Sequence, residues 1–336
     1  MFEKYSYEAD FALKAVRWAS GLCQKIQGEK STPALSKSDR SPVTVADFAS
    51  QAVIARMLND DLPADPLVAE EDSQAIRKPE EQHTLAMVTE FVQQIYPDED
   101  ESSVCARLDF GSANPSSRFW TLDPIDGTKG FLRGGQYVVA LALIEEGQVV
   151  LGALGCPNLN TDLQPDIGGE GASLIAVEGQ GAWVLGMDGD DASRLRVSDL
   201  DRGADARILR SFAVEHTDPD KLDRLVVSLG TSREAVLMDS QAKYALLAAG
   251  RGDLLFRLIS PRRPDYEEFI WDQASGSLIV TEAGGRITDL NGRDLDFTAG
   301  RTLARNTGVV ASNGRLHEQA LRVVQALQRE DQKASS

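Results

Sequence analysis

Apolar residues recur every three or four positions in three segments of the first 96 residues, which is the spacing of one face of a helix. The segments are ADFALKAVRWASGLCQKI, FASQAVIARML directly after Asp47, and LAMVTEFVQQIY. We predict a helix over each segment. The stretch between the first two, GEKSTPALSKSDRSPVT, is polar and rich in turn residues, and we expect a loop there.

Short apolar runs bounded by turn residues predict strands in the middle of the chain. LPADPLVAEEDS contains a short strand that ends in acids, and FWTL is a strand that leads into DPIDGTKGF. YVVALALIEEGQVVLGALG predicts two strands around Glu-Gly, and SLIAVEGQGAWVLG predicts two more around Gly-Gln-Gly. We expect these antiparallel pairs to extend one sheet.

From about residue 207 the pattern alternates between strand and helix, which predicts a second, α/β sheet layer. The expected strands are RILRSFAV, EAVLM and DLLFRL, and the expected helices are DKLDRLVVSL, QAKYALLAAG and WDQASGSLIVTEAG. A last helix is expected near GRLHEQALRVVQALQ, followed by a frayed tail, REDQKASS.

The fold class is therefore α+β or α/β, and the length of 336 residues favours two domains or one large layered unit. CPNLNTDLQPDIGGEGAS is rich in turn residues, so we place a boundary near residue 160. An N-terminal domain, 1–160, would carry most of the candidate metal ligands, and a C-terminal domain, 161–336, would carry the rest of the site.

Composition narrows the classes of function. No run of 18 apolar residues exists, so we expect no membrane span, and the mixed acids and bases at the N-terminus are unlike a targeting segment. Three cysteines without CxxC spacing suggest reduced thiols in a cytoplasmic protein. The net charge of −17 argues against binding to nucleic-acid polymers or to anionic membranes.

The candidate chemistry centres on WTLDPIDGT, which places Asp123 and Asp126 at the end of an apolar strand. An Asp-Gly turn without function is the alternative. If the strand stops at Leu122 and turns through Gly127, Thr128 opens a short helix whose free amides suit a phosphate. Carboxylates face a phosphate only with cations between them, which indicates Mg²⁺ or a similar hard ion.

Further acids end other elements, as a metal site requires. Glu70 and Glu71 follow an apolar strand, while Asp47 and Asp272 lie at helix starts. Each has a plainer interpretation, because Asp47 and Asp272 could be helix caps and Glu70 could lie in a solvated acidic loop. Together they favour a site.

LPADPLVAEEDS, WTLDPIDGT and WDQASGSLIVTEAGGRITD together resemble the signatures of the lithium-sensitive, magnesium-dependent phosphatase superfamily. The resemblance spans about residues 36 to 290. SPVTVADFASQAVI, EHT and SQAKYALLAAGRGDLLFRL are similar to its bisphosphate nucleotidases in particular. It implies a layered αβαβα sandwich, two or three Mg²⁺ ions and inhibition by lithium.

The resemblance also implies roles for individual residues. Asp47 and Thr128 would hold and deprotonate the attacking water, and Asp123 would bridge two ions. The implied metal ligands are Glu70, Asp123, the carbonyl of Ile125, Asp126 and Asp272. The implied substrate contacts are Gly127, Thr128, His216, Ser240, Lys243 and Arg257.

The substrate contacts have structural alternatives. A lone histidine such as His216 at a strand end is usually structural, and Ser240 and Lys243 could be a helix cap and a solvated lysine. Arg262 and Arg263 lie on a loop before Asp272 that departs from the family, where we favour cover of the sheet edge over an anion contact.

We therefore expect a Mg²⁺-dependent phosphomonoesterase that converts adenosine 3′,5′-bisphosphate, a small phosphorylated nucleotide, to AMP. The phosphosulphate derivative is a further candidate substrate. The alternatives are an inositol (poly)phosphate phosphatase of the same superfamily and a non-catalytic, metal-dependent anion binder. The oligomeric state stays open, with a monomer among the options.

Overall fold

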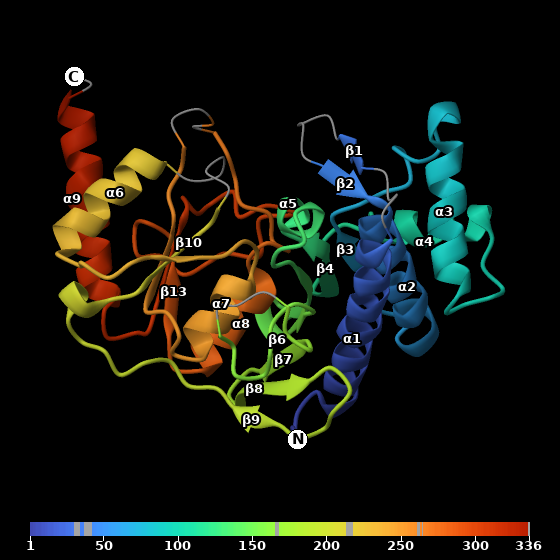
Figure 1. Ribbon diagram of the computed structural model, residues 1–336, viewed down its shortest axis with the longest axis horizontal. Coiled ribbons are helices and arrows are strands. Elements are labelled where there is room, and N and C mark those ends of the chain that lie inside the picture. Colours follow the sequence, from blue (N-terminus) through green and yellow to red (C-terminus); the bar gives the residue numbers. More distant parts are fainter. Residues whose placement is uncertain are drawn as a thin grey trace.

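The computed structural model describes residues 1–29, 34–36, 42–164, 168–212, 218–260, 263 and 265–334. Helices and sheets alternate in five layers across the molecule (Figure 1). The outer helices α1 and α2 cover a seven-stranded sheet, α7 and α8 lie between it and a five-stranded sheet, and α6 and α9 cover the far side. The predicted αβαβα sandwich is confirmed.

The N-terminal helices form where the periodicity predicts them. Helix α1 (Ser6–Gly28) buries its apolar face against α2 (Val45–Asp61) and the first sheet. Helix α2 begins two residues before Asp47, because Thr44 is its N-cap. Helices α3 (Gln82–Gln93) and α4 (Glu101–Phe110) pack on α2. The expected loop before α2 instead contains a two-stranded antiparallel pair, β1 (Ala34–Ser36) and β2 (Pro42–Thr44).

The first sheet has the order β3-β4-β5-β6-β7-β8-β9, in which only the β3–β4 pair is parallel. Both predicted hairpins are confirmed as adjacent antiparallel strands. Their bounds are β3 (Leu67–Ala69), β4 (Arg118–Asp126), β5 (Val138–Glu145), β6 (Gln148–Cys156), β7 (Ala172–Val177), β8 (Gly181–Gly186) and β9 (Ser193–Arg194).

The second sheet has the order β11-β10-β12-β14-β13. Its strands are β10 (Ile208–Arg210), β11 (Val236–Leu237), β12 (Leu254–Arg257), β13 (Arg286–Thr288) and β14 (Val309–Ser312). Its helices are α6 (Pro219–Leu229), α7 (Ala242–Ala248), α8 (Ala274–Glu282) and α9 (His317–Ala334). The alternation predicted from residue 207 is confirmed as far as α8. The pattern gave no prediction for β13 and β14.

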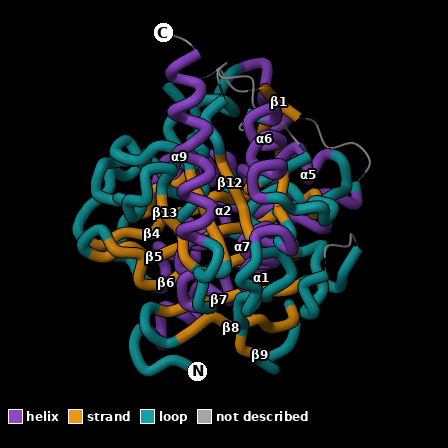
Figure 2. Tube along the Cα trace, turned by 90° about the vertical axis from the view of Figure 1, so that its left-hand side faces the viewer, coloured by secondary structure: helices purple, strands orange, loops and turns teal. Residues whose placement is uncertain are grey.

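The structure bears on the predicted boundary at residue 160 and on the predicted frayed tail. Residue 160 lies between β6 and β7, which are neighbours in one sheet, so the chain changes sheets only between β9 and β10. The division into two domains stays a prediction. The frayed tail is wrong as far as Ala334, because Lys221 and Arg224 of α6 form ion pairs with Asp331 of α9. The two termini lie at opposite ends of the molecule (Figure 2).

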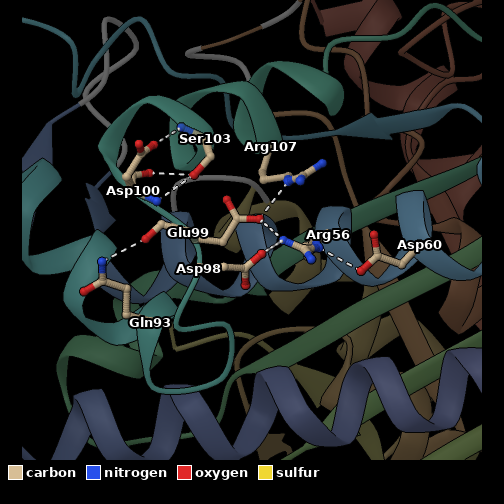
Figure 3. Close-up of polar contacts among 8 residues, drawn as sticks. All are labelled: Arg56, Asp60, Gln93, Asp98, Glu99, Asp100, Ser103 and Arg107. Atoms are coloured by element: carbon tan, nitrogen blue, oxygen red, sulfur yellow. Dashed lines mark hydrogen bonds and ion pairs between the residues drawn. The ribbon is translucent and has the colours of Figure 1, made fainter.

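An ion-pair network fixes α4 and the loop before it to α2 (Figure 3). The carboxylate of Glu99 is almost fully buried and accepts from Arg56 Nη1 at 2.6 Å and from Arg107 Nε at 3.0 Å. Arg56 also pairs with Asp60 and Asp98. Helix α2 carries Asp47 in its first turn, so this network steadies one wall of the candidate site.

Gly130 lies in the short helix α5 (Thr128–Leu132) and has no room for a side chain. A Cβ atom there would lie 2.2 Å from the carbonyl oxygen of Gln136. We expect Gly130→Ala to lower the free energy of unfolding by about 1–3 kcal/mol, the usual cost of overpacking. Urea denaturation measures this change. The matched control is Gly21→Ala in α1, where nothing lies within 4 Å and alanine should stabilise the helix.

Within the described residues, no helix combines the length and the apolar character needed to cross a membrane.

Candidate active site

The parallel pairing of β3 and β4 brings the first two candidate acids together. Ala69 is opposite Leu122, and the amide of Glu70 donates to the carbonyl of Leu122 at 3.2 Å. Glu70 and Asp123 therefore follow paired residues on neighbouring parallel strands. Because both strands end at the same edge of the sheet, their carboxylates reach the same region.

Asp123 is buried, with 2% of its surface exposed. Its Oδ1 atom is buried and has no hydrogen-bond partner among the described residues. Burial, followed by the charge of Glu70 and then those of Asp126, Asp272 and Asp47, raises the pKa of Asp123 well above its usual value. An acceptor oxygen buried among like charges is costly without a cation.

A bulge separates Asp123 from Asp126. The prediction that the strand stops at Leu122 is wrong. Strand β4 continues to Asp126, with a shift of register against β5. A bulge re-aims side chains on its strand, which allows two acids three positions apart to serve one site. Asp126 accepts a hydrogen bond from the amide of Gln241 at 2.5 Å. Burial raises the pKa of Asp126, although Lys243 opposes that shift.

Gly127 turns the chain from β4 into α5. Its φ of +91° lies in the left-handed region, and a Cβ atom would lie 2.9 Å from Cβ of Ser240. A side chain at this position would therefore strain the backbone and push against the loop before α7. The turn places the hydroxyl of Thr128 3.3 Å from the carbonyl oxygen of Ile125.

Asp47 uses its two carboxylate oxygens differently. Oδ2 accepts from the amide and the hydroxyl of Thr44, at 2.8 and 2.6 Å, and so completes a capping box at the start of α2. Oδ1 lies 3.4 Å from the hydroxyl oxygen of Thr128. The N-cap of α2 is Thr44, so the interpretation of Asp47 as the cap itself is wrong, although its side chain completes the capping box. The functional role of Asp47 stays a prediction.

Asp272 lies two residues before α8, whose N-cap is Gln273, so the cap interpretation of Asp272 is wrong. Its Oδ2 atom lies 3.9 Å from Nη2 of Arg257. Burial raises the pKa of Asp272 well above its usual value, against the opposing charge of Arg257 and with further contributions from Asp126 and Glu268. Arg257 itself forms a two-point ion pair with Glu268.

Lys243 is buried, so the solvated-lysine interpretation is wrong. Its Nζ donates to the carbonyl of Ser240 at 2.9 Å. Burial lowers the pKa of Lys243 to about 8, although the charge of Asp126 opposes the shift. Ser240 precedes the N-cap, which is Gln241, yet its hydroxyl still accepts from the amide of Ala242 at 3.2 Å.

The donor set fits hard cations. The carboxylates and the Ile125 carbonyl supply only oxygen atoms, which suit Mg²⁺, and the unpartnered Oδ1 of Asp123 points to a missing positive charge. In the described part of the chain, no three His, Cys, Asp or Glu side chains are already arranged to hold a metal ion.

A model of the inositol monophosphatase family matches residues 4–329. The chain belongs to this family. It is 40% identical to a 3′(2′),5′-bisphosphate nucleotidase of Oryza sativa, over 99% of this chain and 97% of that protein. It is 39% identical to the protein of the same name in Schizosaccharomyces pombe, over 97% of each.

Solved structures show the same fold at lower identity. An IMPase of Thermotoga maritima is similar with a TM-score of 0.67 at 23% identity, over 96% of this chain and 98% of that one. The resemblance inferred from the three acidic motifs is thus confirmed for this member of the inositol monophosphatase family.

Two predicted residues, His216 and Arg262, lie outside the described residues. Arg263 is described, and its exposed guanidinium lies over the ring of Tyr266 at 4.9 Å. Arg263 thus makes an aromatic contact. Its two predicted roles, covering the sheet edge and binding an anion, stay predictions.

No sequence signal pointed to Arg301, which lies on a loop outside the motifs. Its Nη2 donates to the carbonyl of Ala69, and its guanidinium lies 4.9 Å from the ring of Trp271. Ala69 and Trp271 directly precede two candidate metal ligands, Glu70 and Asp272. Arg301 therefore connects two segments that carry candidate metal ligands in this inositol monophosphatase family member. Gln241 was missed because its contacts with Asp126 and Trp271 are long-range, and Glu268 was missed because no motif includes it.

Proposed function

We propose that this chain is a Mg²⁺-dependent phosphomonoesterase that removes the 3′-phosphate of adenosine 3′,5′-bisphosphate to give AMP. The observation that carries the proposal is the buried, unpartnered oxygen of Asp123 amid other carboxylates, in a chain similar over almost its full length to 3′(2′),5′-bisphosphate nucleotidases. The phosphosulphate derivative fits the same chemistry.

Two or three Mg²⁺ ions would be held by oxygen ligands that lie far apart in the sequence. The proposed ligands are Glu70, Asp123, the Ile125 carbonyl, Asp126 and Asp272. Asp123 would contact two ions, which its burial among the other carboxylates supports. When bound, such ions lower the pKa of bound water and neutralise the charge of the phosphate.

Asp47 and Thr128 are proposed to act as a proton-accepting couple. The Thr128 hydroxyl donates toward Oδ1 of Asp47, so its oxygen lone pairs are available to accept a hydrogen bond from the attacking water. The capping box holds the other oxygen of Asp47 and fixes the carboxylate's orientation. A protein that only bound anions would gain nothing from this couple.

Substrate recognition is assigned to the Gly127 turn, Thr128, His216, Ser240, Lys243 and Arg257. Lys243 and Arg257 supply local positive charge in a chain of net charge −17, and a bisphosphate requires such charge. We further propose a monomeric, cytoplasmic protein that acts on small molecules rather than on nucleic-acid polymers.

A phosphate-release assay tests the function directly. The panel contains adenosine 3′,5′-bisphosphate, its phosphosulphate derivative, inositol 1-phosphate, inositol 1,4-bisphosphate and fructose 1,6-bisphosphate, each with Mg²⁺ and with EDTA. We expect Mg²⁺-dependent turnover with the highest kcat/KM for the adenosine compounds. A preference for an inositol phosphate would favour the inositol phosphatase alternative, and binding without turnover would favour the anion binder.

Lys243→Met should raise KM for adenosine 3′,5′-bisphosphate about ten- to a hundredfold, because a charge-assisted contact contributes about 1.5–3 kcal/mol. Steady-state kinetics with inositol 1-phosphate, which lacks a second phosphate, should hardly change. Lys14→Met on the outer face of α1 is the matched control. An equal loss with both substrates would instead place Lys243 at the reacting phosphate, next to Asp126.

Lithium should inhibit the enzyme at millimolar concentrations by competing for one of the weaker Mg²⁺ positions. The measurement compares phosphate release in LiCl with release in NaCl of equal ionic strength. Equal rates in the two salts would show that this site departs from the lithium-sensitive pattern.

A further inference from the structure

Arg257 lies between two carboxylates that differ in their contact with it. Its Nε donates to Oε1 of Glu268 at 2.9 Å, and its Nη2 lies 2.7 Å from Oε2 of the same residue. Nη2 is 3.9 Å from Oδ2 of Asp272. Glu268 therefore binds the guanidinium at the end of β12 through two contacts, whereas Asp272 lies near it without a hydrogen bond.

Glu268 is itself fixed from behind by buried groups. Its side chain is only 3% exposed, and Oε2 also accepts from Nε2 of Gln273 at 2.8 Å. The hydroxyl of Tyr244 in α7 donates to Oε1 of Gln273 at 2.5 Å. Helices α7 and α8 pack so closely that a Cβ atom on Gly276 would lie 2.2 Å from the Tyr244 ring. This chain of contacts leaves Glu268 little freedom to move.

An arginine next to a proposed metal ligand competes with the metal. If Arg257 paired fully with Asp272, its N–H groups would occupy the carboxylate oxygens and cancel the negative charge that a cation requires. The two-point pair with Glu268 opposes this, because Nη2, the guanidinium nitrogen 3.9 Å from Asp272, is already paired with Glu268 at 2.7 Å.

We propose that Glu268 is a positioning residue that holds Arg257 away from Asp272, so that Asp272 stays available to Mg²⁺ and Arg257 stays directed at an anionic group of the substrate. The inference rests on the proposed function for the identity of the cation. It assigns no contact with the reacting atoms to Glu268.

The test is a double-mutant cycle read out by Mg²⁺ binding alone. Isothermal titration calorimetry measures the Kd for Mg²⁺ of the full chain, of Glu268→Gln, of Arg257→Met and of the double variant. We expect Glu268→Gln to raise this Kd about tenfold, equal to about 1.4 kcal/mol, because Arg257 is released toward Asp272. The same substitution beside Arg257→Met should raise the Kd less than about twofold.

The neighbouring acid provides the matched control. Glu267 is exposed, and its Oε2 atom accepts from the hydroxyl of Thr302 at 2.6 Å, so Glu267→Gln should leave the Kd for Mg²⁺ unchanged. Thermal unfolding in EDTA confirms that each variant is folded. If Glu268→Gln does not fold, Glu268→Asp takes its place, with an expected increase of about twofold or more that disappears beside Arg257→Met.

Two results would overturn the inference. One is an unchanged Kd in Glu268→Gln, which leaves Glu268 a purely structural role. The other is an equal increase with and without Arg257, which shows that the effect does not pass through the guanidinium. Failure of the proposed function is separately visible, because the unmodified chain would then bind Mg²⁺ without releasing phosphate from adenosine 3′,5′-bisphosphate.

Discussion

Asp123→Asn is expected to lower kcat for adenosine 3′,5′-bisphosphate by about three orders of magnitude or more. The variant loses several kcal/mol of metal-dependent stabilisation of the transition state, and each ~1.36 kcal/mol corresponds to a tenfold change in rate. The substitution preserves the shape of the side chain and removes its charge. Steady-state phosphate release measures the effect. Asp188→Asn, the same change at an exposed position, is the control and should be silent.

The same variant should be more stable than the unmodified chain when no metal is present. The folded-state pKa of Asp123 is raised by burial and by the surrounding acids, so the cost of keeping it folded grows as the pH rises above the usual aspartate pKa. Asparagine does not ionise and avoids this cost. Thermal unfolding in EDTA should therefore show a larger gain at about pH 8 than at about pH 5.

Activity within tenfold of the unmodified enzyme would remove Asp123 from the metal site. A loss of stability in EDTA would contradict the electrostatic argument, since it would mean that the carboxylate has a stabilising partner in the folded chain. Addition of Mg²⁺ should raise the melting temperature of the unmodified chain and have much less effect on Asp123→Asn.

Asp47→Asn is expected to lower kcat by about 10²–10⁴-fold, the range typical of general-base catalysis, with little change in KM. Thr128→Val should have a comparable effect, because the two groups are proposed to act on one proton. The double variant should be scarcely slower than either single variant, since residues that act as a unit are not additive.

Mg²⁺ binding separates this couple from the metal ligands. Calorimetry should show a much smaller change in the Kd for Mg²⁺ in Asp47→Asn than in Asp123→Asn, because the Asp47 carboxylate is occupied by Thr44 and Thr128 and its charge acts on Asp123 more weakly than those of Glu70, Asp126 and Asp272. Losses that multiply in full in the double variant would show that Asp47 and Thr128 act independently, and the proposed proton-accepting couple would be wrong.

Local sequence determined the parts of this protein whose geometry depends on near neighbours. The periodicity of α1 and the Glu-Gly turn between β5 and β6 were sufficient, because helix and hairpin formation follow spacing and turn chemistry. WTLDPIDGT likewise contains its own bulge, left-handed glycine and helix start. The proposed chemistry was also predicted from the sequence, because the acids at element ends favour a hard-cation site when they are taken together, although each alone could be a helix cap or part of a solvated loop.

Tertiary structure alone decided which of these groups meet and in what state. Burial changed Lys243 from a solvated cation into one whose pKa is about 8. It also paired Arg257 with Glu268 and brought Arg301 between Ala69 and Trp271. The contacts of Arg301 join segments far apart in the chain, whereas Arg257 and Glu268 are 11 positions apart, a separation at which neither helix nor hairpin spacing predicts a contact. Residue spacing does not encode such packing, because burial and long-range contact depend on every layer at once.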